Sequence, residues 1–233
     1  MKRIFVPTTS GSDWQRLLAK PVLHWKKGAS AMTTAASWET CADNLPPEIS
    51  VLLDSSNNPS LVGLQLLAAF PEWEVPLVGG DTTSHTDVLA LCRNDSGLCV
   101  VAVEAKVNED FGPLIQEKKA NPSPGQSARL AYLQTLLGVS SFPDAIRYQL
   151  LHRTASALLT AQAFHARTAV MIVQSFGSKP SLQMDFIAFC EALQAVEVEP
   201  DLYQASFFTG PDVFLGWCNG DKEFCKVELP SLF

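Results

Sequence analysis

The chain has 233 residues, of which 47% are hydrophobic and 18% charged, and its formal net charge is −7. Such a length and composition are those of an ordinary globular protein with a full hydrophobic core. The negative charge argues against a general nucleic-acid coat, because neutralising phosphates requires basic surface. No apolar run reaches the roughly 18 residues of a membrane span, and the N-terminal residues lack the apolar core of a signal peptide. We therefore expect a cytoplasmic protein without membrane association.

The first third of the chain reads mainly as helix. Ser12 opens a capping-box pattern that predicts a short helix. Further helices are expected at 30–42, about 46–54 and 61–70. A strand is expected near 74–78, and Gly79-Gly80 breaks it.

Two apolar runs then predict a β-hairpin. They cover 87–92 and 100–106, and the turn-forming residues of 94–97 join them. A turn centred between Asp95 and Ser96 brings the two charged ends of the hairpin together.

In that register Asp87 lies opposite Glu104, and Cys92 lies opposite Cys99. Directly opposed residues of antiparallel strands have Cβ atoms about 4.5–5.5 Å apart. The sequence therefore places two carboxylates side by side.

The rest of the chain alternates helices and strands after a loop at 121–125. Helices are expected at 127–137, 144–165 and 181–194. Strands are expected at 168–176, 205–208, 213–217 and 224–229. No repeat, low-complexity tract or long linker interrupts the chain. We predict one domain over 1–233, with an α/β fold: a three-layer α/β/α sandwich around a mixed central sheet.

The charged end of the hairpin is the main candidate for chemistry. Glu104 and Lys106 share one face of their strand, because successive side chains alternate. Opposed like charges destabilise a ladder by roughly 0.2–1 kcal/mol, and Mg²⁺, which selects one or two carboxylates, would remove that cost. The alternative is that Lys106 neutralises Glu104 at a frayed strand end, with Asp87 as a polar strand start.

A second polar group lies on the helix expected at 144–165. Gln149, Arg153 and Ser156 are spaced to share one face, with His152 beside them. Arg153 is suited to clamp a phosphate and Gln149 to orient a water molecule. The alternative is an ordinary exposed face of an amphipathic helix.

The order of Asp87, then Glu104-Ala105-Lys106 on the next strand, then helix, strand and helix resembles the PD-(D/E)XK nuclease superfamily. This resemblance implies a restriction endonuclease-like fold with a core of about 30–176 and a C-terminal α/β extension of 177–233. The stretches 104–112 and 147–153 also resemble an uncharacterised bacterial family within that superfamily. Thr86 stands where the superfamily name has proline, which does no chemistry.

The resemblance implies a Mg²⁺ site, with Mn²⁺ as a substitute. Asp87, Glu104 and the carbonyl of Ala105 would hold the ion, and Lys106 would orient or help deprotonate the attacking water. The reaction would be hydrolysis of phosphodiester bonds, of DNA in the first instance and of RNA as an open alternative.

Members of the superfamily often add polar residues from neighbouring helices. Glu39 is the candidate acid from the first core helix, with a solvated helix glutamate as the alternative. Gln149 and Arg153 are the candidates to face the metal or the scissile phosphate.

Two other functions stay open from sequence. The fold could serve as a catalytically inactive binding or regulatory module, which the acidic composition favours modestly. A serine or cysteine hydrolase has little support, because the chain has no Gly-x-Ser-x-Gly elbow. Many restriction-type enzymes act as dimers, so the resemblance also leaves a homodimer open.

Overall fold

A seven-stranded mixed sheet forms the centre of the molecule, in the order β1-β2-β3-β4-β7-β6-β5. The computed structural model describes residues 4, 8, 10–41, 43–177, 179–206 and 210–233. The strands are β1 (Gln65–Val75), β2 (Ser84–Asn94), β3 (Gly97–Lys106), β4 (Thr168–Ser175), β5 (Val196–Glu199), β6 (Leu202–Ala205) and β7 (Asp212–Asn219). Strand β4 runs parallel to β3 and β7, and the other neighbouring pairs are antiparallel.

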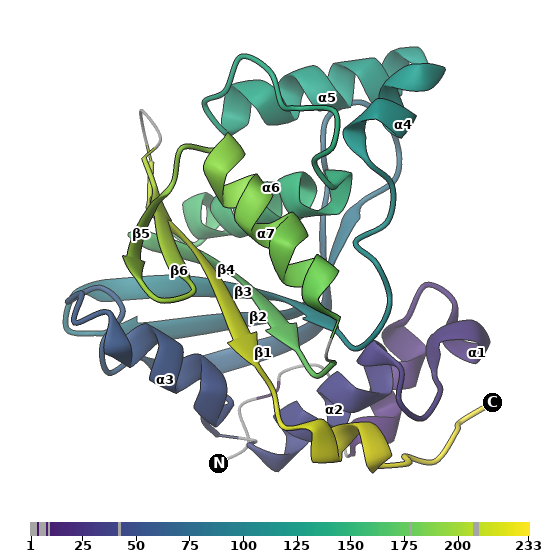
Figure 1. Cartoon of the computed structure of the whole chain (residues 1–233). Coiled ribbons are helices and arrows are strands. Elements are labelled where there is room, and N and C mark those ends of the chain that lie inside the picture. Colours follow the sequence, from purple (N-terminus) through teal and green to yellow (C-terminus); the bar gives the residue numbers. More distant parts are fainter. Residues whose placement is uncertain (1–3, 5–7, 9, 42, 178, 207–209) are drawn as a thin grey trace.

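Helices cover both faces of this sheet and give three layers (Figure 1). The α-helices are α1 (Pro21–His24), α2 (Ser30–Thr40), α3 (Pro47–Ser55), α4 (Ile115–Ala120), α5 (Pro124–Leu136), α6 (Tyr148–Ala163) and α7 (Pro180–Ala192), and the 3-10 helices are η1 (Gly11–Leu17) and η2 (Lys222–Lys226). Helices α4 to α7 lie over one face, and α2 and α3 lie over the other. The α/β sandwich expected from the sequence is therefore present.

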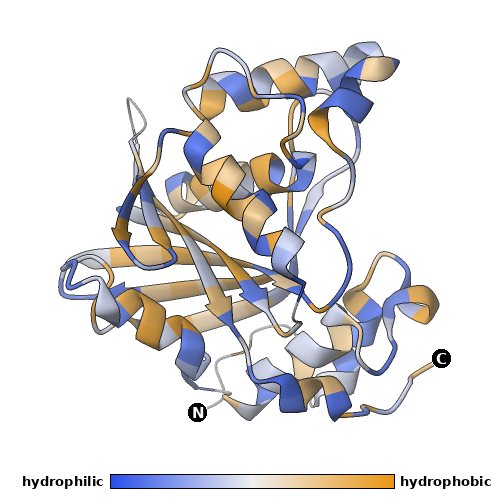
Figure 2. Ribbon diagram, in the orientation of Figure 1, coloured by the Kyte–Doolittle hydropathy of each residue, from blue (hydrophilic) through white to orange (hydrophobic). Residues whose placement is uncertain are grey.

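Alternation along the strands divides the core between the two faces. Val100 and Ala102 of β3 pack toward α6, while Val101 and Val103 pack toward α2. All eight residues of β4 are buried, as expected for a parallel strand with helices on both faces. Figure 2 shows the hydrophobic colouring of the central strands. Glu104 continues the series of Val100 and Ala102, so its side chain lies on the α6 face.

Two predicted elements are wrong. The run 61–70, expected to be a helix, instead leads into β1, because a short apolar run does not distinguish a buried helix from a strand. Pro71 is tolerated in β1 because this strand lies at the edge of the sheet. The strand expected at 224–229 is replaced by η2 and irregular chain.

Most other predictions are close to the structure. Helices α2, α3, α5 and α7 and strands β4 and β7 lie where they were expected, with shifted ends. Helix α6 begins at Tyr148, later than expected, and β5 was not anticipated. The strand expected at 205–208 corresponds to β6, which ends at Ala205, and residues 207 and 208 lie outside the described part of the chain. Within the described residues, every helix is too short or too polar to cross a membrane.

Candidate functional site

The β2–β3 hairpin has the register that its turn predicts. Asn94 pairs with Gly97 at the turn, Cys92 pairs with Cys99, and Val88 pairs with Val103. One residue beyond the last pair, the Asp87 carboxylate accepts a hydrogen bond from the Ala105 amide at 2.7 Å. The turn chemistry therefore brings Asp87 to the Glu104-Ala105-Lys106 segment.

Glu104 is the centre of the polar cluster and is only 2% exposed. Its Oε1 accepts hydrogen bonds from Lys106 Nζ at 2.5 Å and from Gln149 Nε2 at 2.7 Å. Its Oε2 accepts a hydrogen bond from Arg153 Nε. Lys106 does neutralise Glu104, as the alternative expects, but a buried carboxylate with two cationic partners does not lie at a frayed strand end.

Helix α6 supplies Gln149 and Arg153 from successive turns. Arg153 is 7% exposed and Ser156 is fully buried, so this side of the helix is not an ordinary exposed face. Ser156 does not join the cluster, because its hydroxyl donates to the His152 carbonyl at 2.7 Å. Of the predicted helix residues, Gln149 and Arg153 reach Glu104.

A second layer of polar groups surrounds Arg153. Its NH1 donates to Ser84 Oγ at 2.9 Å, and Ser84 Oγ lies 2.9 Å from His152 Nδ1. Arg153 can only donate, so the Ser84 hydroxyl accepts from it and links the guanidinium to the His152 ring. Burial and the nearby Arg153 charge lower the pKa of His152 to about 3, so the ring is neutral at ordinary pH.

Glu72 is a third carboxylate of the cluster, and the sequence analysis missed it. The β1–β2 pairs Pro71–Val88 and Trp73–Thr86 place it opposite Asp87. Its φ of 51° lies in the left-handed region, which a glutamate seldom adopts. The sequence predicts a helix for 61–70 that ends at Pro71, so nothing in it places Glu72 opposite Asp87. That position can be inferred only when this stretch is paired with β2 as a strand.

Burial and like charge disfavour ionisation of two of these acids. Burial and then the Glu104 charge raise the pKa of Asp87 to about 7. Burial and then the Asp87 charge raise the pKa of Glu72 to about 9. Burial also opposes ionisation of Glu104, but Arg153 and Lys106 outweigh it and hold its pKa at about 2.

Lys106 is a buried cation. Burial alone would lower its pKa, but Glu104 and Asp87 outweigh that effect and raise it. The ammonium therefore stays charged and can donate hydrogen bonds, which suits it to orient an oxygen atom.

Glu39 lies apart from this cluster. It belongs to α2, which covers the opposite face of the sheet, and its carboxylate accepts a hydrogen bond from Trp14 Nε1 at 2.8 Å. The neighbouring Trp38 donates to Gln174 on that same face at 3.1 Å. Helix α2 thus directs its polar groups away from Glu104.

The carbonyl of Ala105 lies on the Asp87 side of β3. The Lys106 carbonyl accepts a hydrogen bond from the Phe176 amide next to β4. Successive residues of a strand direct their backbone groups to opposite neighbours, so both polar groups of Ala105 face β2. Ala105 and Asp87 therefore offer oxygen atoms to the same space.

This donor set fits Mg²⁺ in kind, since hard oxygens from one or two carboxylates are what the ion selects. Each carboxylate oxygen has about two lone-pair positions, so Oε2 of Glu104 keeps one beyond its bond to Arg153. Across the described residues, no three acidic, histidine or cysteine side chains are already gathered closely enough to hold a metal ion. Binding would therefore require movement of Glu72 or Glu104 toward Asp87.

A cavity of about 370 Å³ lies over the cluster. Lys106, Gln149 and His152 line it, together with Lys118 and Tyr148. Lys106 is the charged group of the cluster that lines this cavity, and Gln149 connects the cavity to the buried Glu104 carboxylate.

Comparison with known proteins gives a family without an assigned activity. Residues 7–222 match the family described as Domain of unknown function (DUF6946). The chain belongs to this family. The DUF6946 match contains Glu72, Asp87, Glu104, Lys106 and Arg153, so the whole cluster lies inside the family domain. No curated protein and no solved structure matches the chain.

Proposed function

We propose that the chain is a metal-dependent nuclease with a restriction endonuclease-like core, which hydrolyses phosphodiester bonds of DNA or RNA. The observation that carries this proposal is that Glu72, Asp87 and Glu104 occupy neighbouring positions on three adjacent strands, with charged Lys106 hydrogen-bonded to Glu104. Carboxylates on neighbouring strands gain from a divalent cation that draws them together, because the cation removes their mutual repulsion.

In this proposal some residues hold the metal ion and others orient the reacting groups. Asp87, Glu104 and the Ala105 carbonyl would hold Mg²⁺, with Glu72 as a further carboxylate at its edge. Bound there, the ion would polarise a phosphoryl oxygen and stabilise the charge that develops during in-line displacement. Lys106 would hold an oxygen of the attacking water or the phosphate by donating hydrogen bonds.

Arg153 takes a positioning role in this proposal. Its bonds to Glu104 and Ser84 occupy the buried guanidinium and fix the Glu104 carboxylate. Gln149 reaches the same carboxylate from one helical turn earlier, and its amide lines the cavity where a water would enter.

The test is a calorimetric Mn²⁺ titration, followed by incubation of labelled DNA and RNA oligonucleotides with Mg²⁺ or with EDTA. We expect saturable Mn²⁺ binding and Mg²⁺-dependent cleavage by the wild-type chain. Both are expected to be lost in Asp87→Asn and weakened in Glu72→Gln. The matched control is Asp95→Asn, an exposed position at the other end of the same hairpin.

Cleavage that survives Asp87→Asn and Glu104→Gln unchanged would contradict the proposal. A second candidate function follows from the hydrogen bonds that Lys106, Gln149 and Arg153 already donate to Glu104, because they compete with a metal ion for this carboxylate. That candidate is a nucleic-acid binding or regulatory module without catalysis. It predicts oligonucleotide binding without Mn²⁺ binding and without turnover.

A further inference from the structure

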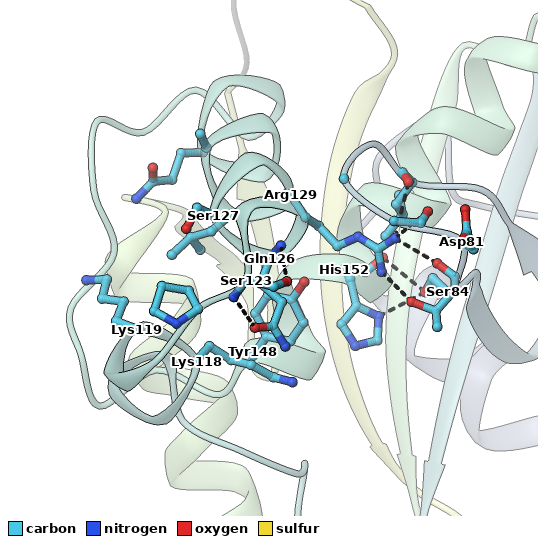
Figure 3. Close-up of a pocket in the computed structure, with 18 of the residues that line it drawn as sticks. Asp81, Ser84, Lys118, Lys119, Ser123, Gln126, Ser127, Arg129, Tyr148 and His152 are labelled. Atoms are coloured by element: carbon cyan, nitrogen blue, oxygen red, sulfur yellow. Dashed lines mark hydrogen bonds between the residues drawn. The ribbon is translucent and has the colours of Figure 1, made fainter.

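A second, larger cavity adjoins the candidate site. It has a volume of about 610 Å³ and lies between residues 77–84, helix α5 and the first turns of α6 (Figure 3). It shares Lys118, Tyr148 and His152 with the cavity over Lys106. A ligand that spans these three residues therefore reaches both cavities.

The walls combine an aromatic surface with hydrogen-bonding groups. The Tyr148 and His152 rings lie 5.3 Å apart, and Leu77 and Leu130 add apolar surface. Hydroxyl and amide groups complete the lining, from Thr82, Thr83, Ser84, Ser123, Gln126 and Ser127. A cavity that combines an aromatic surface with several hydrogen-bonding groups suits a ligand with a flat ring and a polar edge.

The two ends of the cavity carry different charged groups. Lys118 Nζ lies 5.3 Å from the centre of the Tyr148 ring, at the wall shared with the site. Asp81 lies across the cavity from Lys118 (Figure 3). A phosphate would be attracted to Lys118 at the shared wall. At the far end Asp81 can accept hydrogen bonds from amino groups, and Arg129 bonds to the carbonyls on either side of it, so that end carries both signs of charge.

The far wall is preformed. Arg129 donates hydrogen bonds to the carbonyls of Leu77, Val78, Gly80 and Thr82 and to the Thr82 hydroxyl. Gly79 packs so closely on α5 that an added Cβ would lie 2.3 Å from the Gly125 carbonyl oxygen. A wall fixed in this way holds its shape before a ligand binds.

We propose that this cavity holds one unpaired nucleobase of a strand whose phosphate lies over Lys106, so that the preferred ligand is single-stranded nucleic acid. The inference rests on the proposed function only for the placement of that phosphate. A base in a duplex would have to leave its stack to enter the cavity, whereas a base in a single strand is already free to do so. Stacking on Tyr148 would tolerate any base, because every base has a π face.

The experiment measures fluorescence anisotropy of labelled oligothymidylate and of a blunt duplex of equal length, in EDTA to prevent turnover. We expect the wild-type chain to bind the single strand more tightly than the duplex. Ser127→Trp, at an exposed position of α5 that lines the cavity, is expected to weaken single-strand binding at least about tenfold by filling the space. Ala128→Trp places the same side chain on the next exposed position, outside the lining, and is expected to bind as wild type does.

Equal single-strand binding by Ser127→Trp and wild type would overturn the inference, as would tighter binding of the duplex. Thymidine monophosphate is added as a competitor. If it binds as tightly as the oligonucleotide, the cavity serves a free mononucleotide and the strand proposal fails.

The same variants keep this inference distinct from the proposed function. Metal-dependent cleavage that Ser127→Trp leaves intact would reject the cavity assignment while the nuclease stands. Strand binding that Ser127→Trp loses, in a chain that never cleaves, would keep the cavity assignment and reject the nuclease.

Discussion

The buried carboxylate of Glu104 is stabilised in its charged form by the groups around it. A carboxylate removed from water loses several kcal/mol of hydration, and only good geometry with opposite charges offsets the loss. Lys106, Gln149 and Arg153 provide that geometry, and they come from β3 and α6. Removing the carboxylate would leave two buried cations without their main partner.

We therefore predict that Glu104→Ala lowers the free energy of unfolding by about 3–5 kcal/mol. Urea denaturation checks this value. Glu191→Ala, an exposed site on α7, serves as the control and is expected to stay within about 0.5 kcal/mol of wild type. A small decrease in the free energy of unfolding of Glu104→Ala would mean that Lys106 and Arg153 are solvated in the variant.

His152 gives the stability a pH dependence of known sign. Its folded-state pKa is about 3, lowered by burial, Arg153, Arg129 and Lys118 against the opposing pull of Glu104. The unfolded value is about 6.5, so the unfolded chain binds a proton first as the pH falls. The contribution of His152 is complete above that value and is lost progressively below it.

We expect His152→Gln to remove about 1–2 kcal/mol of the stability difference between about pH 7 and pH 5. Urea denaturation at the two pH values gives this difference. His24→Gln, an exposed change on α1, is the control and should keep the wild-type slope. An unchanged slope in His152→Gln would show that the ring is already solvent-accessible.

At the scale of helices and strands, the predictions were right where the structure depends on residues close together in the sequence. The β2–β3 register follows from the turn at Asp95 and Ser96 alone, so the sequence was enough. Strand β1 depends instead on pairing with β2 and on an isolated bridge between Ile4 and Ala69. Such long-range partners leave no periodic signal in a short apolar run, and Glu72 was missed together with its strand.

The connection from β1 to β2 depends on one side chain of α5. Arg129 makes five hydrogen bonds to residues 77–82, and lysine cannot reproduce this planar set of donors. We predict that Arg129→Lys lowers the free energy of unfolding by about 1–3 kcal/mol and speeds hydrogen exchange in 77–84.

Hydrogen exchange with mass spectrometry measures the second effect. Arg93→Lys, at an exposed position of β2, is the matched control. If protection of 77–84 were equal in both variants, the loop would be held by the contact between Gly79 and Gly125 instead.

At the scale of the whole molecule, the sequence predicted the layers but not the contents of each face. Asp87, Glu104, Lys106, Gln149 and Arg153 were expected together, and they lie together on the α6 face. Glu39 was expected with them but lies across the sheet, because residue spacing within a helix does not say which face of a sheet that helix will cover. The parts of the site that depend on the register of one hairpin can therefore be predicted from sequence. The parts that depend on which face of the sheet a helix covers cannot.

The overall charge of −7 limits the electrostatic part of any nucleic-acid binding. Lys106 and Lys118 are the cations that line the cavity over the cluster. With about two phosphate contacts, the logarithm of single-strand affinity should fall with the logarithm of salt concentration with a slope of about −1.4.

Anisotropy titrations at several salt concentrations give this slope. Lys118→Met should make it less steep by about 0.7, while Lys27→Met, whose side chain is 53% exposed beside Glu228, should leave it unchanged. A much steeper wild-type slope would mean that the strand follows a longer basic track.

The split of the cluster between β3 and α6 also sets an order of events during synthesis. Glu72, Asp87, Glu104 and the cation Lys106 are all added to the chain before Arg153. Until then Lys106 is the cluster's cation, and water and counterions shield the remaining charge of the carboxylates. Docking of α6 therefore completes the neutralisation of Glu104, so the nascent N-terminal half stays open to chaperones until the second half arrives.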